Sequence, residues 1–250
     1  IKRIVRDETV AEAVSVCVKS LVPVVRLLRL TDTKLGATLG KVYAYMLQLD
    51  EYFRQPIDGM PERMRLKLHA IFMARWEYFY VPVMTAAYPF EPEFCRRSFS
   101  SLEMKDVKDV LRKMACDEHP LANLFAQFAD YEEALLSGTH DLDDSVAFSA
   151  MAQKITSYKW AKIYLARWPD LAWATTRLLS MTCSASGCED SWSVEGWFHS
   201  KKRNRMGQKT VERLVRAHTN LVLERRFEEA AFAVLPWDLE MVLDEPSEEE

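Results

Sequence analysis

Glu189 carries a carboxylate, a group whose oxygens can ligate a hard cation such as Mg²⁺. It stands near the start of an expected helix and shares a helix face with Trp192, Gly196 and His199, at spacings of three, four and three residues. Mg²⁺ needs several oxygen ligands, so one carboxylate does not hold it alone. The alternative is that Glu189 has no metal role and is only an acid near a helix N-terminus, where the helix dipole stabilises its charge. Trp192 either packs beneath Glu189 and directs it or is a core anchor.

A basic run follows directly. Between His199 and Arg226 the chain carries nine lysines and arginines against two glutamates, although its formal net charge is -4. A local positive excess of this kind suits contacts with DNA phosphates, and its first part also resembles a nuclear-import patch. The other interpretation is a solvated segment, or one neutralised by acidic residues elsewhere. The predicted nucleic-acid contacts are His199, Lys201, Lys202, Arg203 and Arg205.

Two helices must position these residues, one from about Cys188 to His199 and one from Gly207 to about Ala231. The second has an apolar stripe at helical spacing, which needs a partner surface. The stripe comprises Val211, Leu214, Val215, His218, Leu221 and Val222. The sequence leaves open whether this surface is a second subunit or the rest of the same chain. Within the stripe, the predicted dimerisation residues are Val211, Leu214, Val215 and Leu221.

The preceding residues also indicate helices. The first has one apolar face and contains Pro23, which should kink or break it. A second is expected after a cap at Asp32 or Thr33. Ser100 and Glu103 have the spacing of a capping box, and another helix is expected from Asp144 to about Trp168. The segment 88–92 should be extended, because residues that precede proline avoid the helical region.

Composition restricts the fold class and the cofactors. Only seven glycines, with 49% hydrophobic and 28% charged residues, favour a mainly α protein. The five cysteines have neither disulfide-framework nor structural-zinc spacing, so no cofactor is expected in this chain. No apolar run is long enough to cross a bilayer and no signal peptide is seen, so no membrane partner is expected. The end, 244–250, holds five acids and is expected to be disordered.

The segment 182–206 reads TCSASGCEDSWSVEGWFHSKKRNRM. It resembles the signature of the hAT C-terminal dimerisation region, in which a serine-rich turn, a Glu and an aromatic with Ser precede His-x-Lys-Lys-Arg-Asn-Arg and a hydrophobic residue. The flanks are similar too. The matching residues there are Trp160, Pro169, Leu171, Ala172, Ala174, Leu178, Leu179 and Ser180 upstream, and Leu214, Val215, Asn220 and Leu221 downstream. The chain therefore resembles the C-terminal part of an hAT-family transposase, encoded by a transposable element.

The rest of the chain is similar to the helical insertion domain of plant-type hAT proteins, at 23–32, 39–43, 75–76 and 86–88. In that family the insertion domain interrupts an RNase H-like fold. The resemblance implies a helical insertion domain at 1–157. A C-terminal dimerisation region would follow at 158–233 and an acidic tail at 234–250. The implied fold is mainly α, an insertion domain followed by the C-terminal helices of an interrupted RNase H-like fold.

The resemblance also implies a role for Glu189 as the third carboxylate of a metal-binding acidic triad, with Mg or Mn as the ion in the complete enzyme. The strands that carry the two catalytic aspartates would precede Ile1, so we expect the chain to be a piece of a longer protein with no metal site of its own. Two departures from the family pattern are Asp190, where an Arg is usual, and Pro89–Pro92, which replaces a leucine-asparagine-proline stretch.

Two functions follow from these features. The first is a transposase-derived protein that forms a homodimer or higher oligomer through residues 158–233 and contacts the DNA backbone without sequence specificity. The alternative is the C-terminal half of an active transposase that cleaves and transfers DNA strands with metal ions. This chain is not expected to be an active enzyme alone. Both functions imply a nuclear protein.

Overall fold

The computed structural model describes residues 8–32, 37–138, 142, 147–149, 155–184, 186–198 and 206–230. These residues are mainly helical and contain no strand, which confirms the mainly α fold class. None of the helices within them has the length and apolar character needed to span a bilayer. The predicted tail at 234–250 lies outside the described residues.

The chain divides into two compact units, residues 1–184 and 185–250. The first contains α2 (Glu8–Asp32), α3 (Leu39–Arg54), α4 (Glu62–Phe79), α5 (Pro82–Ala87), the 3₁₀ helix η1 (Tyr88–Phe90), α6 (Ser101–Met114), α7 (Leu121–Ser137), α8 (Ser157–Tyr164) and α9 (Pro169–Leu179). The second contains α10 (Ser186–Phe198) and α11 (Gln208–Ala230). The units divide at 184/185, whereas the predicted domain limit at 157/158, drawn from family resemblance, stays a prediction.

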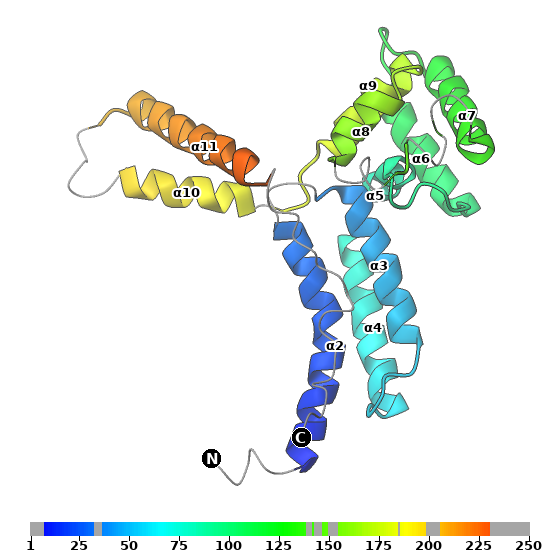
Figure 1. Cartoon of the computed structure of the whole chain (residues 1–250), viewed down its shortest axis with the longest axis vertical. Helices are drawn as coiled ribbons and strands as arrows, with labels where there is room; N and C mark the ends of the chain where they lie inside the picture. The colour runs from blue at the N-terminus through cyan, green and yellow to red at the C-terminus, as the bar shows by residue number, and fades with distance from the viewer. Residues whose placement is uncertain are drawn as a thin grey trace. The chain divides into compact units, whose positions relative to one another are not determined.

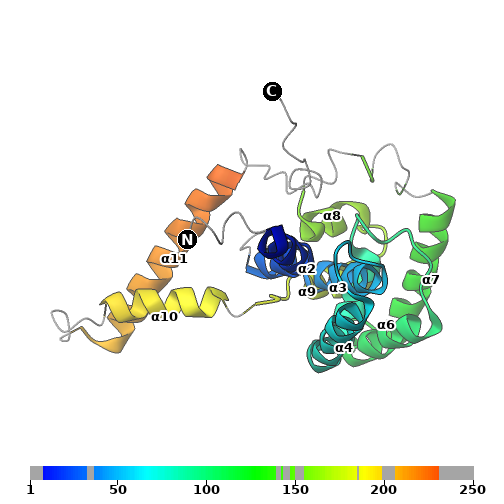
Figure 2. The same cartoon turned by 90° about the horizontal axis from the view of Figure 1, so that it is seen from below.

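The first unit has one large core, a smaller one and a third cluster of buried residues at Tyr43, Ala44 and Tyr88. The large core lies among η1 and the helices from α5 to α9, and its biggest fully buried side chains include Phe90, Tyr131 and Trp160. The smaller core lies between α3 and its neighbours α2 and α4, with Phe53 at its centre. In Figures 1 and 2, α3 and α4 run side by side, and α3 leads toward the helices of the large core. This helix therefore contributes to both cores.

Several expected element boundaries differ in the structure. Pro23 was expected to kink or break its helix; α2 continues through it, so the helix does not break there. The cap of α3 is Thr38, whose hydroxyl accepts a hydrogen bond from the Lys41 N–H at 3.1 Å. Residues 88–90 form a 3₁₀ helix rather than an extended segment, because Tyr88 and Phe90 are buried there. The helix expected from Asp144 begins only at Ser157, since 147–149 form a turn.

A buried carboxyl group joins three of these elements. Glu91 follows η1 and is fully buried. The Ser157 hydroxyl at the start of α8 donates to its Oε2 at 2.5 Å, and the Thr38 hydroxyl at the start of α3 donates to its Oε1. Burial raises the pKa of Glu91, although the hydrogen bonds from Ser157 and Thr38 oppose the shift. Both oxygens thus have a hydroxyl donor in the interior.

Gly40 lets α3 approach this carboxyl closely. A Cβ at this position would lie 2.8 Å from Glu91 Cγ and 2.9 Å from the Ala87 carbonyl carbon. We expect Gly40→Ala to lower the free energy of unfolding by about 1–3 kcal/mol, because the side chain would overpack the junction. Urea unfolding followed by circular dichroism measures this. Gly196→Ala in α10, where an added Cβ meets nothing within 4 Å, is the control; an equal stability for Gly40→Ala and wild type would contradict the expectation.

Candidate functional site

The second unit carries most of the residues that the sequence selects. Helices α10 and α11 lie side by side within it. Glu189 is exposed in the first turn of α10. His199, Lys201, Lys202, Arg203 and Arg205 lie outside the described residues, so the structure says nothing of the predicted phosphate contacts there.

The tryptophans of α10 are on the surface. Trp192 is 65% exposed and Trp197 is 61% exposed. Trp192 is therefore not the core anchor that the sequence allowed. The sequence analysis did not select Trp197 as a candidate site residue. Its exposure could have been inferred from its neighbour Phe198, which is buried. Two neighbouring aromatic residues on an α-helix point about 100° apart, so one of such a pair faces away from a core that buries the other.

The predicted stripe on α11 separates into buried and exposed residues. Val211 is fully buried, and Val215 is half-buried. Leu214 is 36% exposed and Leu221 is 65% exposed. A groove between α10 and α11 is lined by both polar and apolar side chains, among them Glu195, Val211, Val215, Arg216 and Asn220. A partner can therefore reach Leu214 and Leu221 directly and Val215 through the groove, whereas Val211 belongs to the interior.

The surface of α11 is mostly basic outside this stripe. Lys209, Arg213, Arg216 and Arg225 are exposed there, and His218 is exposed within the stripe. Of the acids on the same helix, Glu212 and Glu224 have described side chains, and both are exposed. The part of the basic run whose side chains the structure describes is therefore solvent-facing.

A metal site is not formed by the described residues. Among them, no group of three or more His, Cys, Asp or Glu side chains is arranged to hold a metal ion. Glu189 would therefore need carboxylates from elsewhere to build one, as a single carboxylate gives too few ligands.

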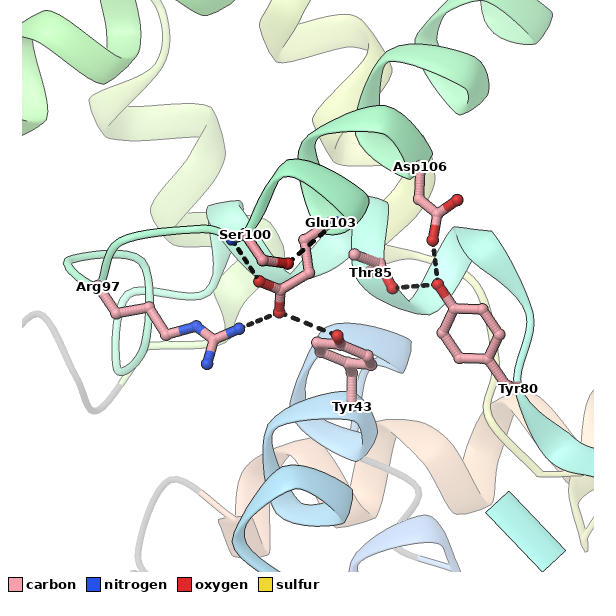
Figure 3. A network of polar contacts seen from close by, with 7 residues as sticks. All are labelled: Tyr43, Tyr80, Thr85, Arg97, Ser100, Glu103 and Asp106. Atoms are coloured by element: carbon pink, nitrogen blue, oxygen red, sulfur yellow. Dashed lines mark hydrogen bonds and ion pairs between the residues drawn. The ribbon is translucent and has the colours of Figure 1, made fainter. Parts of the chain in front are cut away.

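The first unit contains a cluster of titratable groups where α3, α5 and α6 meet (Figure 3). The carboxylate of Glu103 accepts hydrogen bonds from the Ser100 N–H at 2.8 Å and the Tyr43 hydroxyl at 2.9 Å, and it pairs with Arg97. The Ser100 hydroxyl in turn accepts from the Glu103 N–H, which completes the predicted capping box. Both oxygens of Glu103 are thus engaged by protein donors.

A second branch of this cluster centres on Tyr80. Its hydroxyl lies 2.8 Å from the Thr85 hydroxyl and donates to the carboxylate of Asp106. Burial, followed by the hydrogen bond to Asp106, raises the pKa of Tyr80 to about 12. A raised phenol pKa and a saturated carboxylate are poor acid–base catalysts at neutral pH. The cluster in Figure 3 therefore holds helices together rather than reacting.

A second such cluster joins α7 to α9. The carboxylate of Asp170 lies 2.6 Å from His119 Nδ1 and accepts from the Gln127 amide at 2.7 Å. The hydrogen bond with His119 is the main cause of the lowered pKa of Asp170. The His119 ring stacks on Trp173 at 4.2 Å between centroids. The pair has the form of an acid–histidine dyad, but its hydrogen bonds connect α9 to α7 and to the residues before it.

We expect Glu103 to make stability depend on pH. Burial alone would raise its pKa, but the hydrogen bonds from Ser100 and Tyr43 and the charge of Arg97 hold the pKa below its ordinary value. Since the folded-state pKa is below the unfolded one, ionised Glu103 stabilises the fold above the ordinary glutamate pKa. This stabilisation is lost as the pH falls through the folded-state pKa.

Glu103→Gln should therefore cost about 1–3 kcal/mol of unfolding free energy near neutral pH and much less in acid. Urea unfolding at about pH 7 and about pH 3 measures both values. Glu77→Gln, on the exposed side of α4, is the control. A pH-independent loss in Glu103→Gln would contradict the electrostatic origin and leave only packing.

Comparison with known proteins finds a family match in the C-terminal part of the chain. Residues 134–221 match the model of the hAT family C-terminal dimerisation region. The matched segment starts in α7, contains α8, α9 and α10, and ends in α11. No curated protein matches the chain.

Proposed function

We propose that the chain self-associates through the exposed apolar side chains of α10 and α11. Its residues 134–221 match the hAT family C-terminal dimerisation region, which supports a role in protein dimerisation. The observation that carries this proposal is the exposure of Trp192, Trp197 and Leu221, each more than 60% accessible. Tryptophan is enriched among the residues that dominate binding energy at protein interfaces.

The position of these residues on α11 supports a helix-packing interface. Leu214 and Leu221 are seven residues apart, so they lie on one face of α11, two turns apart. Val211 is buried and anchors the opposite side of the stripe within the unit. A second copy that packs along Leu214 and Leu221 would remove both from water and would also close the groove that Val215 lines.

We expect Leu214→Asp/Val215→Asp to reduce the molar mass of the assembly by at least half. Each aspartate would place an unpaired charge in the apolar interface, and two such changes weaken association by a factor of about 100 or more. Light scattering with in-line size exclusion measures the mass, and circular dichroism checks that the helices remain.

Leu136→Asp is the matched control, because Leu136 is 87% exposed on α7 and should change neither mass nor helix content. A wild-type chain that stays monomeric at micromolar concentration would rule out the proposal. An unchanged mass in a folded Leu214→Asp/Val215→Asp protein would move the interface away from α11.

A second part of the proposal concerns DNA. The exposed Lys209, Arg213, Arg216 and Arg225 continue the basic run that begins at His199. Dimerisation would place two such runs in one assembly, which strengthens binding to a long polyanion by raising the effective concentration of the second run. Backbone contact of this kind is independent of base sequence. A DNA-contacting role would also require entry into the nucleus, for which Lys201–Arg205 is the proposed signal.

Lys201→Ala/Lys202→Ala/Arg203→Ala/Arg205→Ala should weaken binding to mixed-sequence duplex DNA. It should also reduce the slope of log affinity against log salt by up to about 0.9 for each phosphate that is no longer neutralised. Fluorescence anisotropy over a salt series measures the slope. A variant with Lys105, Lys108 and Lys113 of α6 changed to alanine is the control. The same slope in wild type and the 201–205 variant would contradict phosphate contact by this segment.

One observation supports the alternative function, metal-dependent cleavage of DNA strands. Glu189 is exposed in the first turn of α10, so its carboxylate is accessible to a metal ion shared with other carboxylates. Mg²⁺ or Mn²⁺ would there activate the attacking oxygen and stabilise the leaving one. Two further aspartates, from outside this chain, would have to complete the ligand set in an RNase H-like fold.

A further inference from the structure

Helix α2 presents an apolar stripe to solvent that the proposed α10–α11 interface does not use. Val14, Val18, Leu21, Val25 and Leu28 are between 42% and 57% exposed. They belong to a face distinct from the one that carries Val24 and Leu27, which pack on the smaller core of the first unit. A groove along this face has almost entirely apolar lining. Among the residues that the structure describes, nothing packs on the stripe, whereas Val24 and Leu27 attach α2 to the first unit.

The spacing of the stripe is that of a coiled coil. Its residues follow one another at intervals of four, three, four and three, which is the alternation of the d and a positions of a heptad. This 3.5-residue repeat fits a second helix of similar length, since it runs over two heptads without interruption at Pro23.

The charges of α2 select the orientation of that second helix. The helix begins with Glu8 and Glu12 and ends its basic part with Arg26 and Arg29. Two parallel copies would place like charges beside one another, whereas two antiparallel copies place the acidic end of each against the basic end of the other. Antiparallel packing also sets the two helix dipoles head to tail.

We propose that α2 pairs with α2 of a second copy of this chain as an antiparallel coiled coil around a two-fold axis. The register follows from matching a positions with d positions. Val18 then lies opposite the second copy's Leu21, and Val14 opposite its Val25. Ala11, a small side chain, lies opposite the large Leu28 of the other copy, so the seam is complementary in size as well as in charge.

This interface goes beyond the proposed function, because it is independent of α10 and α11. A chain with two separate two-fold interfaces assembles beyond the dimer, either into a closed tetramer or into a row of alternating contacts. Removal of one interface leaves dimers held by the other, and removal of both leaves monomers. The two proposals can therefore fail separately.

The first test measures molar mass for four full-length proteins by sedimentation or light scattering. These are wild type, Leu214→Asp/Val215→Asp, Val18→Glu/Leu21→Glu and the combination of all four changes. We expect the Leu214→Asp/Val215→Asp protein to remain a dimer and the combined variant to have half its mass. A monomeric Leu214→Asp/Val215→Asp protein overturns α2 pairing and leaves the α11 interface standing. A combined variant that is still dimeric overturns α2 pairing as well.

Matched controls separate a disrupted interface from a disrupted fold. Leu136→Glu/Ile163→Glu adds the same charges at exposed positions of the same unit and should leave the mass unchanged. Circular dichroism should report wild-type helix content for every protein, since Val18 and Leu21 are about half exposed and contribute little to the core.

A second test is independent of charge insertion and reports the orientation. In a Cys17→Ser parent, Val14→Cys and Val25→Cys are made separately, mixed and oxidised. Antiparallel pairing predicts a crosslinked dimer in the mixture well above that of either protein alone. Like positions lie 11 residues apart along the axis in the proposed register, about 16 Å, which is beyond the reach of a disulfide. Crosslinking of each protein with itself, or no crosslinking above the Cys17→Ser parent, would overturn the proposal.

Discussion

The first unit depends on the carboxyl group of Glu91, which is buried where three elements begin or end. Its side chain takes hydroxyl donors from α3 and α8, and its backbone carbonyl accepts the N–H groups of Phe94 and Cys95 at 2.9 and 2.8 Å. A buried acid costs free energy unless its polar atoms are satisfied. Each of these donors must therefore stay in place. The position of Thr38 sets the start of α3, and the close approach of α3 to Glu91 leaves no room for a side chain at Gly40.

This requirement explains which local structures the sequence predicts and which it does not. The capping box of Ser100 and Glu103 was predictable because a cap is made by residues three apart. The 3₁₀ helix at 88–90 was not, because its conformation is stabilised by distant partners, such as the Tyr131 hydroxyl that donates to the Pro89 carbonyl at 2.7 Å. Helix α2 likewise continues through Pro23, although proline is about 3 kcal/mol less favourable than alanine in a helix interior, so one proline did not predict a helix end.

The candidate interface shows the same limit. Periodicity placed Val211 and Leu214 in one stripe, yet one is fully buried and the other is partly exposed. A period gives the direction of a side chain around its helix but not the identity of what covers it. For the same reason Trp192 was compatible with a core position. The family motif located the region correctly, whereas only coordinates separate the residues that build the unit from those left for a partner.

The apolar surface of the chain is unevenly distributed, and this is the strongest physical reason to regard it as a component of an assembly. The core around Tyr131 and Trp160 is closed, with the Trp160 indole N–H donating to the Ala147 carbonyl at 2.8 Å. By contrast, α2 exposes valines and leucines in a row, and α10 exposes two tryptophans. Single exposed apolar residues are ordinary, but contiguous ones mark interaction surfaces. Association along α2 would bury its row without rearranging the core, because Val24 and Leu27 attach the helix to the first unit through another face.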